Sequence, residues 1–422
     1  MTFFQSVKQE IKTLLRAEKV FLFFAMVVGF CIAGEYAITR PASTAIFLTN
    51  YSTTALPYIW LATAPLNFLI VYLYNRFLPV IGPLKMLGSI AAAATIINLS
   101  CSFLLPYFPS LILFQFAWKD VYILLMFKQL WSLIHSTIPQ GKAKYLYGLI
   151  YGMGTIGSIS CSLIPGFFAG TLGSENLFLF TLPFYAVLFW AYRKAFKTSP
   201  LTESSFSKTL SVNPHPREAL SLIQRNKFLL SLLFLVVFMQ VSVGLMEYQF
   251  NSYLELHVAT KDLRTAYCGR VTGLTNILSG LFQFFGSFLM VHAFGLRGSH
   301  LFIPLILLSN TLVFAFIPSF AMISFAFIFL KAIDFSLFGV IREMLYIPLK
   351  LDEKFRAKAI IDVFAHRTSK AFISLFIVGM QIAASTYLLP LMSYISLAVF
   401  LGWTLLVVKM FKQYPVSAGS SS

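Results

Sequence analysis

The chain contains a long series of apolar stretches, each about as long as a membrane-spanning helix. A helix crosses the hydrocarbon of a bilayer with about 20 apolar residues. Hydrophobic residues make up 58% of the sequence and charged residues 11%, against about 25% charged in soluble domains, so an ordinary soluble fold is excluded. We predict an all-α multi-pass membrane protein with twelve transmembrane helices, at residues 20–39, 57–75, 85–105, 118–137, 145–171, 176–195, 228–250, 268–291, 299–317, 320–346, 368–387 and 389–409.

Lys and Arg are distributed very unevenly over the connections between these spans. The termini and the even-numbered connections hold 24 of them, whereas the odd-numbered connections hold three, namely Arg40, Lys261 and Arg264. Basic residues accumulate on the cytoplasmic side of membrane proteins, so the distribution predicts two cytoplasmic termini and an even number of spans. The net charge of +17 therefore reflects membrane topology, and we expect the lipid bilayer rather than a nucleic acid as the partner.

A polar stretch at residues 196–227 divides the predicted spans into two sets of six, and short patterns recur on its two sides. The recurring pairs are Lys128-Gln129 with Arg342-Glu343, Ala143-Lys144 with Ala357-Lys358, and Glu35-Tyr36 with Glu247-Tyr248. Such a repeat predicts a 6+6 pseudo-twofold, major-facilitator-like architecture. The predicted parts are an N-terminal six-helix bundle at 1–195, a cytoplasmic linker at 196–227, a C-terminal six-helix bundle at 228–412 and a disordered tail at 413–422.

Charged residues inside the spans are candidates for the functional site. An ionised side chain in hydrocarbon costs at least about 3 kcal/mol, so it should face a cavity or a partner. The repeat relates Glu35 to Glu247 and Lys128 to Arg342. The two cations would attract phosphate or carboxylate groups, and the two acids would neutralise them in the empty protein or take up a proton. We therefore predict an anionic small-molecule cargo, with Glu35 and Glu247 as candidates for proton coupling.

The alternative reading is that these charges are fixed salt bridges between helices. We favour it for Lys331 and Asp334, which are spaced i,i+3 on one helix face. Glu343 follows Arg342 directly and should point elsewhere, which suggests a structural role. His135 is interpreted as a packing or hydrogen-bonding residue.

No enzyme motif is present in the sequence. GxSxG, P-loop and HExxH patterns are absent, and the four Cys residues have no metal-binding spacing. We expect a protein that is not an enzyme and needs neither a cofactor nor a metal.

The second half of the chain carries a distinctive run of residues at 336–372. Its motif positions are Arg342-Glu343-Met344, Tyr346-Ile347-Pro348-Leu349, Ala357-Lys358-Ala359, Ile361-Asp362-Val363, Arg367 and Lys370. This run resembles the ATP/ADP translocase family, the nucleotide transporters of obligate intracellular bacteria and plastids. The resemblance extends over most of the chain and is strongest after residue 225. It implies a secondary transporter for nucleotides, a monomer in a bacterial inner membrane, that works by ATP/ADP-type exchange or proton-coupled uptake.

The chain departs from the family pattern at several charged positions. Family members that exchange ATP for ADP carry an Arg-Asp-Thr-Lys-Asp run after the first span, where this chain has Arg40-Pro41-Ala42-Ser43-Thr44. Gln129 replaces a family Glu, Arg342 replaces a family Lys, and Glu247 is unchanged. The predicted substrate-binding residues are Glu35, Arg40, Lys128, Gln129, Glu247 and Arg342.

Three functions remain open on the sequence. The first is a nucleotide carrier, for which labelled nucleotide should enter proteoliposomes. The second is a carrier of another anionic or cofactor-like metabolite on the same scaffold, whose uptake nucleotides would not inhibit. The third is a membrane receptor or assembly partner, in which neutral substitutions of Glu247 and Lys128 would leave function intact.

Overall fold

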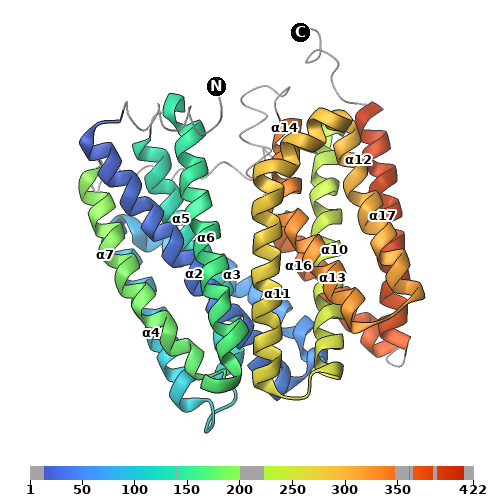
Figure 1. Ribbon diagram of the computed structural model, residues 1–422, viewed down its shortest axis with the longest axis horizontal. Coiled ribbons are helices and arrows are strands. Elements are labelled where there is room, and N and C mark those ends of the chain that lie inside the picture. Colours follow the sequence, from blue (N-terminus) through green and yellow to red (C-terminus); the bar gives the residue numbers. More distant parts are fainter. Residues whose placement is uncertain are drawn as a thin grey trace. The chain divides into compact units, whose positions relative to one another are not determined.

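The computed structural model describes residues 14–138, 140–199, 223–346, 361, 365–383 and 387–412, and every regular element within them is helical (Figure 1). The predicted linker lies mostly outside these residues, and the predicted tail lies wholly outside them. The elements of the first half are α2 (Arg16–Tyr51), η1 (Thr53–Ala55), α3 (Leu56–Ile81), α4 (Pro83–Leu104), α5 (Leu111–Thr137), α6 (Gln140–Leu172), η2 (Asn176–Thr181) and α7 (Leu182–Thr198). Those of the second half are α10 (Lys227–His257), α11 (Lys261–Leu281), η3 (Phe282–Gly286), α12 (Ser287–Phe316), α13 (Phe320–Ile333), η4 (Asp334–Phe338), α14 (Gly339–Leu345), α16 (His366–Ala383) and α17 (Leu388–Lys412).

The prediction of an all-α membrane protein is confirmed. Within the described residues, eight helices are long and apolar enough to cross a bilayer. Helix α5 is not among them, and its Lys119, Asp120 and Lys128 lower its hydropathy. Each predicted span falls largely on helix, but the count of twelve spans stays a prediction.

Helix α2 is much longer than the span predicted at 20–39. It has 36 residues, which at 1.5 Å per residue gives a length of about 54 Å, against about 30 Å for the hydrocarbon core. It continues through Pro41 to Tyr51. The expectation that Arg40 lies in a connection is therefore wrong. Proline is tolerated inside membrane helices, so Pro41 does not mark the end of this one.

The chain forms two compact units, and each contains a segment from the opposite half of the sequence. Unit 1 comprises residues 1–51, 65–212 and 259–276, and unit 2 comprises 52–64, 213–258 and 277–422. Helices α3 and α11 therefore each contribute to both units. The exchanged segments are 52–64 in unit 2 and 259–276 in unit 1.

Each of the two exchanged segments takes part in hydrogen bonds between a carboxylate side chain and a turn of the chain. In unit 2, Glu255 Oε2 accepts hydrogen bonds from the backbone N–H of Thr53 at 2.7 Å and from Ser52 Oγ at 3.1 Å. In unit 1, Asp262 Oδ1 accepts from the backbone N–H of Ser174 at 2.8 Å and from its hydroxyl at 2.5 Å. Each acid thus satisfies a backbone donor that would otherwise lack a partner at the start of a turn.

The core of unit 1 is built around α2, which packs against α5, α6 and α7. Fully buried side chains such as Phe21, Ile32 and Leu125 fill the space between these helices. Gly157 on α6 allows the closest approach, because a Cβ there would lie 2.5 Å from the carbonyl oxygen of Phe30. Small residues at such positions let helix backbones meet directly in a membrane.

A second close contact joins α6 to the first part of α11, also within unit 1. A Cβ on Gly269 would lie 2.5 Å from the backbone nitrogen of Gly166. Along the same contact, Arg270 Nε donates to the carbonyl of Gly166 at 3.0 Å and Asn276 Nδ2 donates to Ser158 Oγ at 2.6 Å. The contact combines backbone packing with interhelical hydrogen bonds, the two forces that join helices in lipid.

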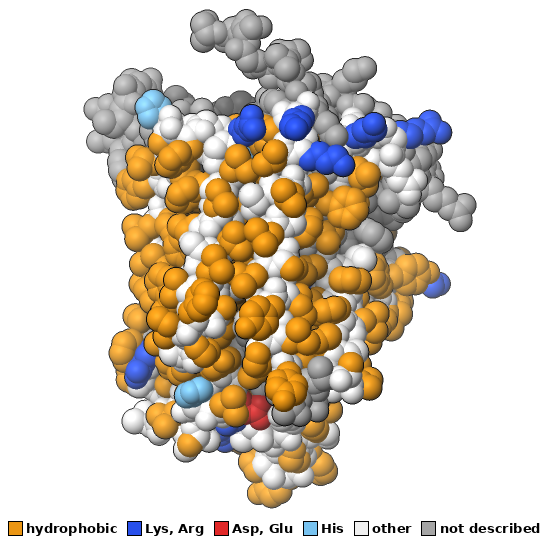
Figure 2. Space-filling model, turned by 90° about the vertical axis from the view of Figure 1, so that its right-hand side faces the viewer, with side chains coloured by type: hydrophobic (Ala, Val, Ile, Leu, Met, Phe, Trp, Pro, Cys, Tyr) orange, Lys and Arg blue, Asp and Glu red, His pale blue; other side chains and the backbone are white. Residues whose placement is uncertain are grey.

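Hydrophobic side chains dominate the outer surface. Figure 2 shows a face covered by them, with Lys and Arg gathered mainly at one end. Exposed large hydrophobic residues occur throughout α12 and α17, including Leu289, Leu305, Leu401 and Leu405. A surface of this kind is stable against lipid tails and would be an aggregation hazard in water.

Replacing Gly269 by alanine should destabilise unit 1 by about 1–3 kcal/mol, because the added Cβ overlaps backbone atoms that cannot rotate away. The measurement is the midpoint of thermal unfolding of the purified protein in detergent. Gly170→Ala is the matched control, since nothing lies within 4 Å of a Cβ at that position. Equal midpoints for the two variants would show that the α6–α11 contact is looser than described.

Candidate functional site

Unit 2 contains a partly buried ion pair between two helices. Lys331 Nζ on α13 lies 3.0 Å from Glu247 Oε2 on α10, and the side chains are 8% and 18% exposed. The sequence identified Glu247 as a site residue but paired Lys331 with Asp334. The structure gives Lys331 a partner on a different helix, Glu247, in addition to its electrostatic interaction with Asp334.

Asp334 lies one turn beyond Lys331 and forms its hydrogen bond to α10. Gln240 Nε2 donates to Asp334 Oδ1 at 3.2 Å. Lys331, Arg342 and Glu247 are all close enough to Asp334 to interact with its charge. Two acids and two cations of unit 2 therefore form one electrostatic cluster, which we call the unit 2 charge cluster: Glu247, Lys331, Asp334 and Arg342.

The helix that carries three members of this cluster is not regular. Between α13 and α14 the chain forms a π-helical turn, η4, that begins at Asp334. A second π-helical turn, η3, packs against η4. Such single π-helical turns are frequently found at functional sites. Beyond η4, the Arg342 guanidinium lies 5.7 Å from the centre of the Phe338 ring and 3.9 Å from Glu343 Oε1, so Glu343 interacts with its neighbour.

Substituting Lys331 by methionine should lower the free energy of unfolding by about 1–3 kcal/mol, because Glu247 would lose its cation in an apolar setting. The double variant Lys331→Met/Glu247→Gln should recover most of this loss, since it removes both charges. Thermal unfolding of the single and double variants measures the coupling. If the double variant is as unstable as the sum of the single ones, the pair contributes nothing to stability.

In unit 1 the repeat-related acid has a different environment. Glu35 on α2 is 1% exposed. Its Oε1 accepts hydrogen bonds from Thr39 Oγ1 at 2.5 Å, Tyr122 Oη at 2.6 Å and Tyr185 Oη at 2.7 Å. Its Oε2 has no hydrogen-bond partner within the residues that the structure describes. The acid is thus held by neutral hydroxyls inside its own helix bundle.

The hydrogen bonds continue through four helical elements of unit 1. Asn98 Nδ2 on α4 donates to Tyr185 Oη at 3.0 Å, and Gln115 Nε2 on α5 donates to Asn98 Oδ1 at 3.4 Å. Ser43 Oγ on α2 donates to Gln115 Oε1 at 2.5 Å. All these side chains are almost fully buried. Sequence reasoning missed the network, although uncharged polar residues inside apolar runs, such as Asn98, were a usable signal.

Removing one hydroxyl donor from Glu35 by Tyr185→Phe should cost about 1–2 kcal/mol of unfolding free energy, because a buried carboxyl group then loses a partner. The matched control is Tyr192→Phe. Tyr192 is also buried, and its hydroxyl has no hydrogen-bond partner among the described residues, so its loss should be neutral. Thermal unfolding distinguishes the two, and an equal effect would mean that the hydroxyl network does not stabilise unit 1.

The structure does not bring the other predicted site residues of unit 1 to Glu35. Lys128 Nζ donates to Asn75 Oδ1 at 2.8 Å and lies 4.9 Å from the centre of the Tyr74 ring. Gln129 is fully buried and donates to the carbonyl of Pro83 at 3.2 Å. The Arg40 guanidinium lies 6.0 Å from the centre of the Tyr36 ring. Their roles in binding stay predictions.

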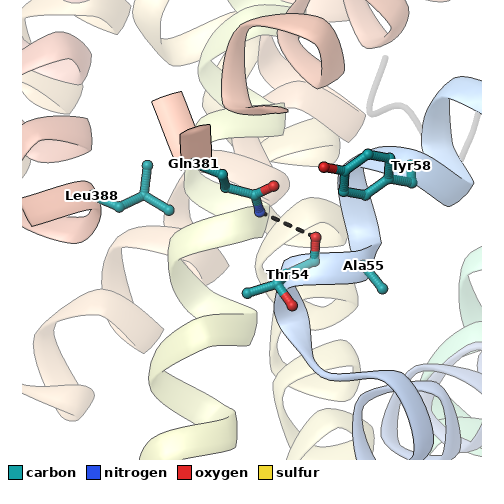
Figure 3. Close-up of a pocket in the computed structure, with 5 residues that line it drawn as sticks. All are labelled: Thr54, Ala55, Tyr58, Gln381 and Leu388. Atoms are coloured by element: carbon teal, nitrogen blue, oxygen red, sulfur yellow. Dashed lines mark hydrogen bonds between the residues drawn. The ribbon is translucent and has the colours of Figure 1, made fainter. Parts of the chain in front are cut away.

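Unit 2 also contains a pocket of about 390 Å³, lined by Thr54, Ala55, Tyr58, Gln381 and Leu388 (Figure 3). Gln381 Nε2 donates to the carbonyl of Thr54 at 3.1 Å and to Tyr248 Oη at 3.0 Å. None of the five lining residues is charged. The pocket can hold an apolar or hydrogen-bonding group, but it offers no cation for a phosphate.

Residues 321–414, which include most of α13 and all of α14, α16 and α17, match the family model of the TLC ATP/ADP transporter. The "ADP,ATP carrier protein 1" of Chlamydia trachomatis serovar D is 24% identical over 219 residues, 47% of this chain and 42% of that protein. The carrier of the same name from Chlamydia pneumoniae is 24% identical over 214 residues, 46% of this chain and 42% of that protein. The chain is therefore similar to the TLC ATP/ADP transporters over part of its length. The alignments span less than half the length of these carriers.

Solved transporters share the fold. A nucleoside transporter, NupG, has a TM-score of 0.62 at 10% identity and covers 95% of this chain and 99% of its own. A D-xylose-proton symporter has a TM-score of 0.58 at 14% identity, with 96% and 99% covered. These structures bear on the fold alone, whereas the matches to the TLC model and to the Chlamydia carriers confirm the family resemblance noted in the sequence. The relatives are carriers, in agreement with the expectation that this TLC relative is not an enzyme.

Proposed function

We propose that the chain is a secondary transporter that moves a nucleotide across the membrane by alternating access. The observation that carries the proposal is the unit 2 charge cluster. Three of its four members, Lys331, Asp334 and Arg342, lie in the segment that matches the TLC model. The named relatives are ADP,ATP carriers, and a phosphate-bearing cargo fits a site with two cations.

The Glu247–Lys331 pair explains how such a cargo could be bound and released. Breaking a buried ion pair leaves an uncompensated charge, which is costly. A phosphate oxygen that replaces Glu247 at Lys331 would keep the cation paired while it adds the contacts of the cargo. Arg342 can hold two phosphate oxygens at once through its guanidinium. Binding and release thus exchange one partner of Lys331 for another.

The same exchange allows both transport modes that the family resemblance implies. In ATP/ADP-type exchange, one nucleotide would replace another at the cations. In proton-coupled uptake, Glu247 would take up a proton when cargo displaces it from Lys331. We keep Glu247 as the main candidate for proton coupling, because Glu35 is enclosed by the hydroxyls of Thr39, Tyr122 and Tyr185.

The membrane arrangement that we propose has twelve spans in a 6+6 pattern. The 24 basic residues in the termini and even-numbered connections support two cytoplasmic termini. A bacterial inner membrane and a monomeric carrier follow from the family resemblance.

A carrier of another anionic metabolite is the second candidate, and the buried residues of unit 1 favour it in one respect. Ser43 and Gln129 stand at positions where the family pattern has charges, and both are fully buried and bonded to neutral partners. The cargo of this chain need not be the cargo of its relatives. A metabolite panel distinguishes the two candidates.

Purified protein in proteoliposomes should take up labelled ATP or ADP. Arg342→Ala should reduce uptake at least tenfold, because a charge-assisted bidentate contact is worth about 1.5–3 kcal/mol. The matched control is Arg297→Ala, which removes an exposed arginine from α12 of the same unit. Saturable uptake of another anion that nucleotides fail to inhibit would favour the second candidate. Uptake that Arg342→Ala leaves unchanged would remove the unit 2 charge cluster from the proposed site.

A further inference from the structure

A cluster of four aromatic side chains lies on α5 and α6 of unit 1. The Trp131 ring is at its centre, 5.1 Å from Tyr151, 5.6 Å from His135 and 5.7 Å from Tyr147, between ring centroids. Tyr147 Oη and His135 Nδ1 are 2.8 Å apart and form a hydrogen bond. We call this group the unit 1 aromatic cluster.

The rings of the unit 1 aromatic cluster contact one another but remain partly exposed at the surface of the protein. His135 is exposed, Tyr151 is 54% exposed, and Trp131 and Tyr147 are intermediate. Trp131 and Tyr151 are tilted by 35° to each other, while Tyr147 stands nearly edge-on to Trp131 at 72°. Such an arrangement leaves aromatic faces accessible, so a further flat ring can stack on the cluster.

The position of the two tyrosines on α6 argues against a lipid-facing surface. Tyr151 and Tyr147 precede Ser158 by seven and eleven residues, which are about two and three turns, so all three lie on one helix face. Ser158 is the residue that accepts the hydrogen bond from Asn276 of α11. The face of α6 that carries the tyrosines is therefore the face that packs against α11 two to three turns further along.

The cluster breaks the internal repeat of the sequence. At the offset that relates Lys128 to Arg342, the positions equivalent to Trp131, His135, Tyr147 and Tyr151 are Leu345, Leu349, Ile361 and Ala365. The second half of the sequence thus has aliphatic residues where the first half has aromatic ones. The aromatic character belongs to one half only, which is typical of a specific contact rather than of the scaffold.

A cation accompanies the aromatic rings. Lys128 precedes Trp131 by three residues and His135 by seven, so the three residues lie along one face of α5. Lys128 Nζ is held by Asn75 Oδ1 at 2.8 Å. Flat rings beside a positioned ammonium group suit a ligand that combines an aromatic heterocycle with a negative charge.

We propose that the unit 1 aromatic cluster is a stacking subsite for the nucleobase of the cargo. The inference rests on the proposed nucleotide transport and adds the recognition of the base to it. Trp131 and Tyr151 provide the stacking surface, and the Tyr147–His135 hydrogen bond fixes the edge of the cluster. Stacking tolerates any base, because every base has a π face. The subsite therefore distinguishes nucleotides from anions that lack a ring.

The test is ligand binding to the purified full-length protein in detergent, with ATP, adenosine and inorganic tripolyphosphate as probes. Tyr151→Leu and Trp131→Leu should each weaken ATP and adenosine binding by about tenfold, the loss typical of one base–aromatic stack. Tripolyphosphate binding should remain unchanged, because it has no ring. Tyr151→Phe should bind ATP like the wild type.

The matched control is Tyr72→Leu, which removes a tyrosine of 59% exposure from α3 of the same unit. It should leave all three affinities unchanged. If the wild type binds ATP and Tyr151→Leu binds it equally well, the stacking subsite is wrong while the proposed transport stands. An equal loss for ATP and tripolyphosphate, with a lower unfolding midpoint, would show that the rings have only a structural role. If the folded wild type binds no nucleotide, the proposed function fails and the subsite with it.

Discussion

The ion pair between Glu247 and Lys331 joins α10 to α13 and places two opposite charges inside an apolar helix bundle. An apolar helix bundle tolerates a charge only beside a partner, and here each partner comes from a different helix. Asp334 and Arg342 extend the pair into a cluster of two acids and two cations. The π-helical turn η4 lies between Lys331 and Arg342. Because Lys331 needs a negatively charged partner in this apolar bundle, it is also the residue at which we propose that an anionic cargo binds.

Glu35 in unit 1 and Glu247 in unit 2, which the sequence repeat relates, have different kinds of partner. Glu247 has a cation, whereas Glu35 has three hydroxyl donors and is sealed inside unit 1. A hydroxyl network rigidifies a bundle without adding charge. Unit 1 carries an open group of aromatic rings around Trp131 instead.

The sequence predicted the helical class well, because apolar runs of span length have few other stable outcomes. It also proposed Glu247 and Arg342 as site residues, since charges inside such runs are conspicuous, and their roles in binding stay predictions. It related Lys331 to Asp334 by their i,i+3 spacing but missed the ion pair of Lys331 with Glu247, because a contact from α13 to α10 is not visible in the sequence. It ended the first span at residue 39, whereas the helix continues through Pro41 to Tyr51. The exchanged segments 52–64 and 259–276 depend on tertiary packing and left no local signal.

Counterflow distinguishes a nucleotide carrier from a membrane protein that does not move nucleotides. Proteoliposomes are loaded with unlabelled ATP and placed in a trace of labelled ATP outside. A carrier should accumulate label transiently above the external concentration, and Glu247→Gln should alter the time course, because the partner of Lys331 has lost its charge. If the label never exceeds the external concentration, although the protein is folded and retains its unfolding transition, the protein does not carry ATP.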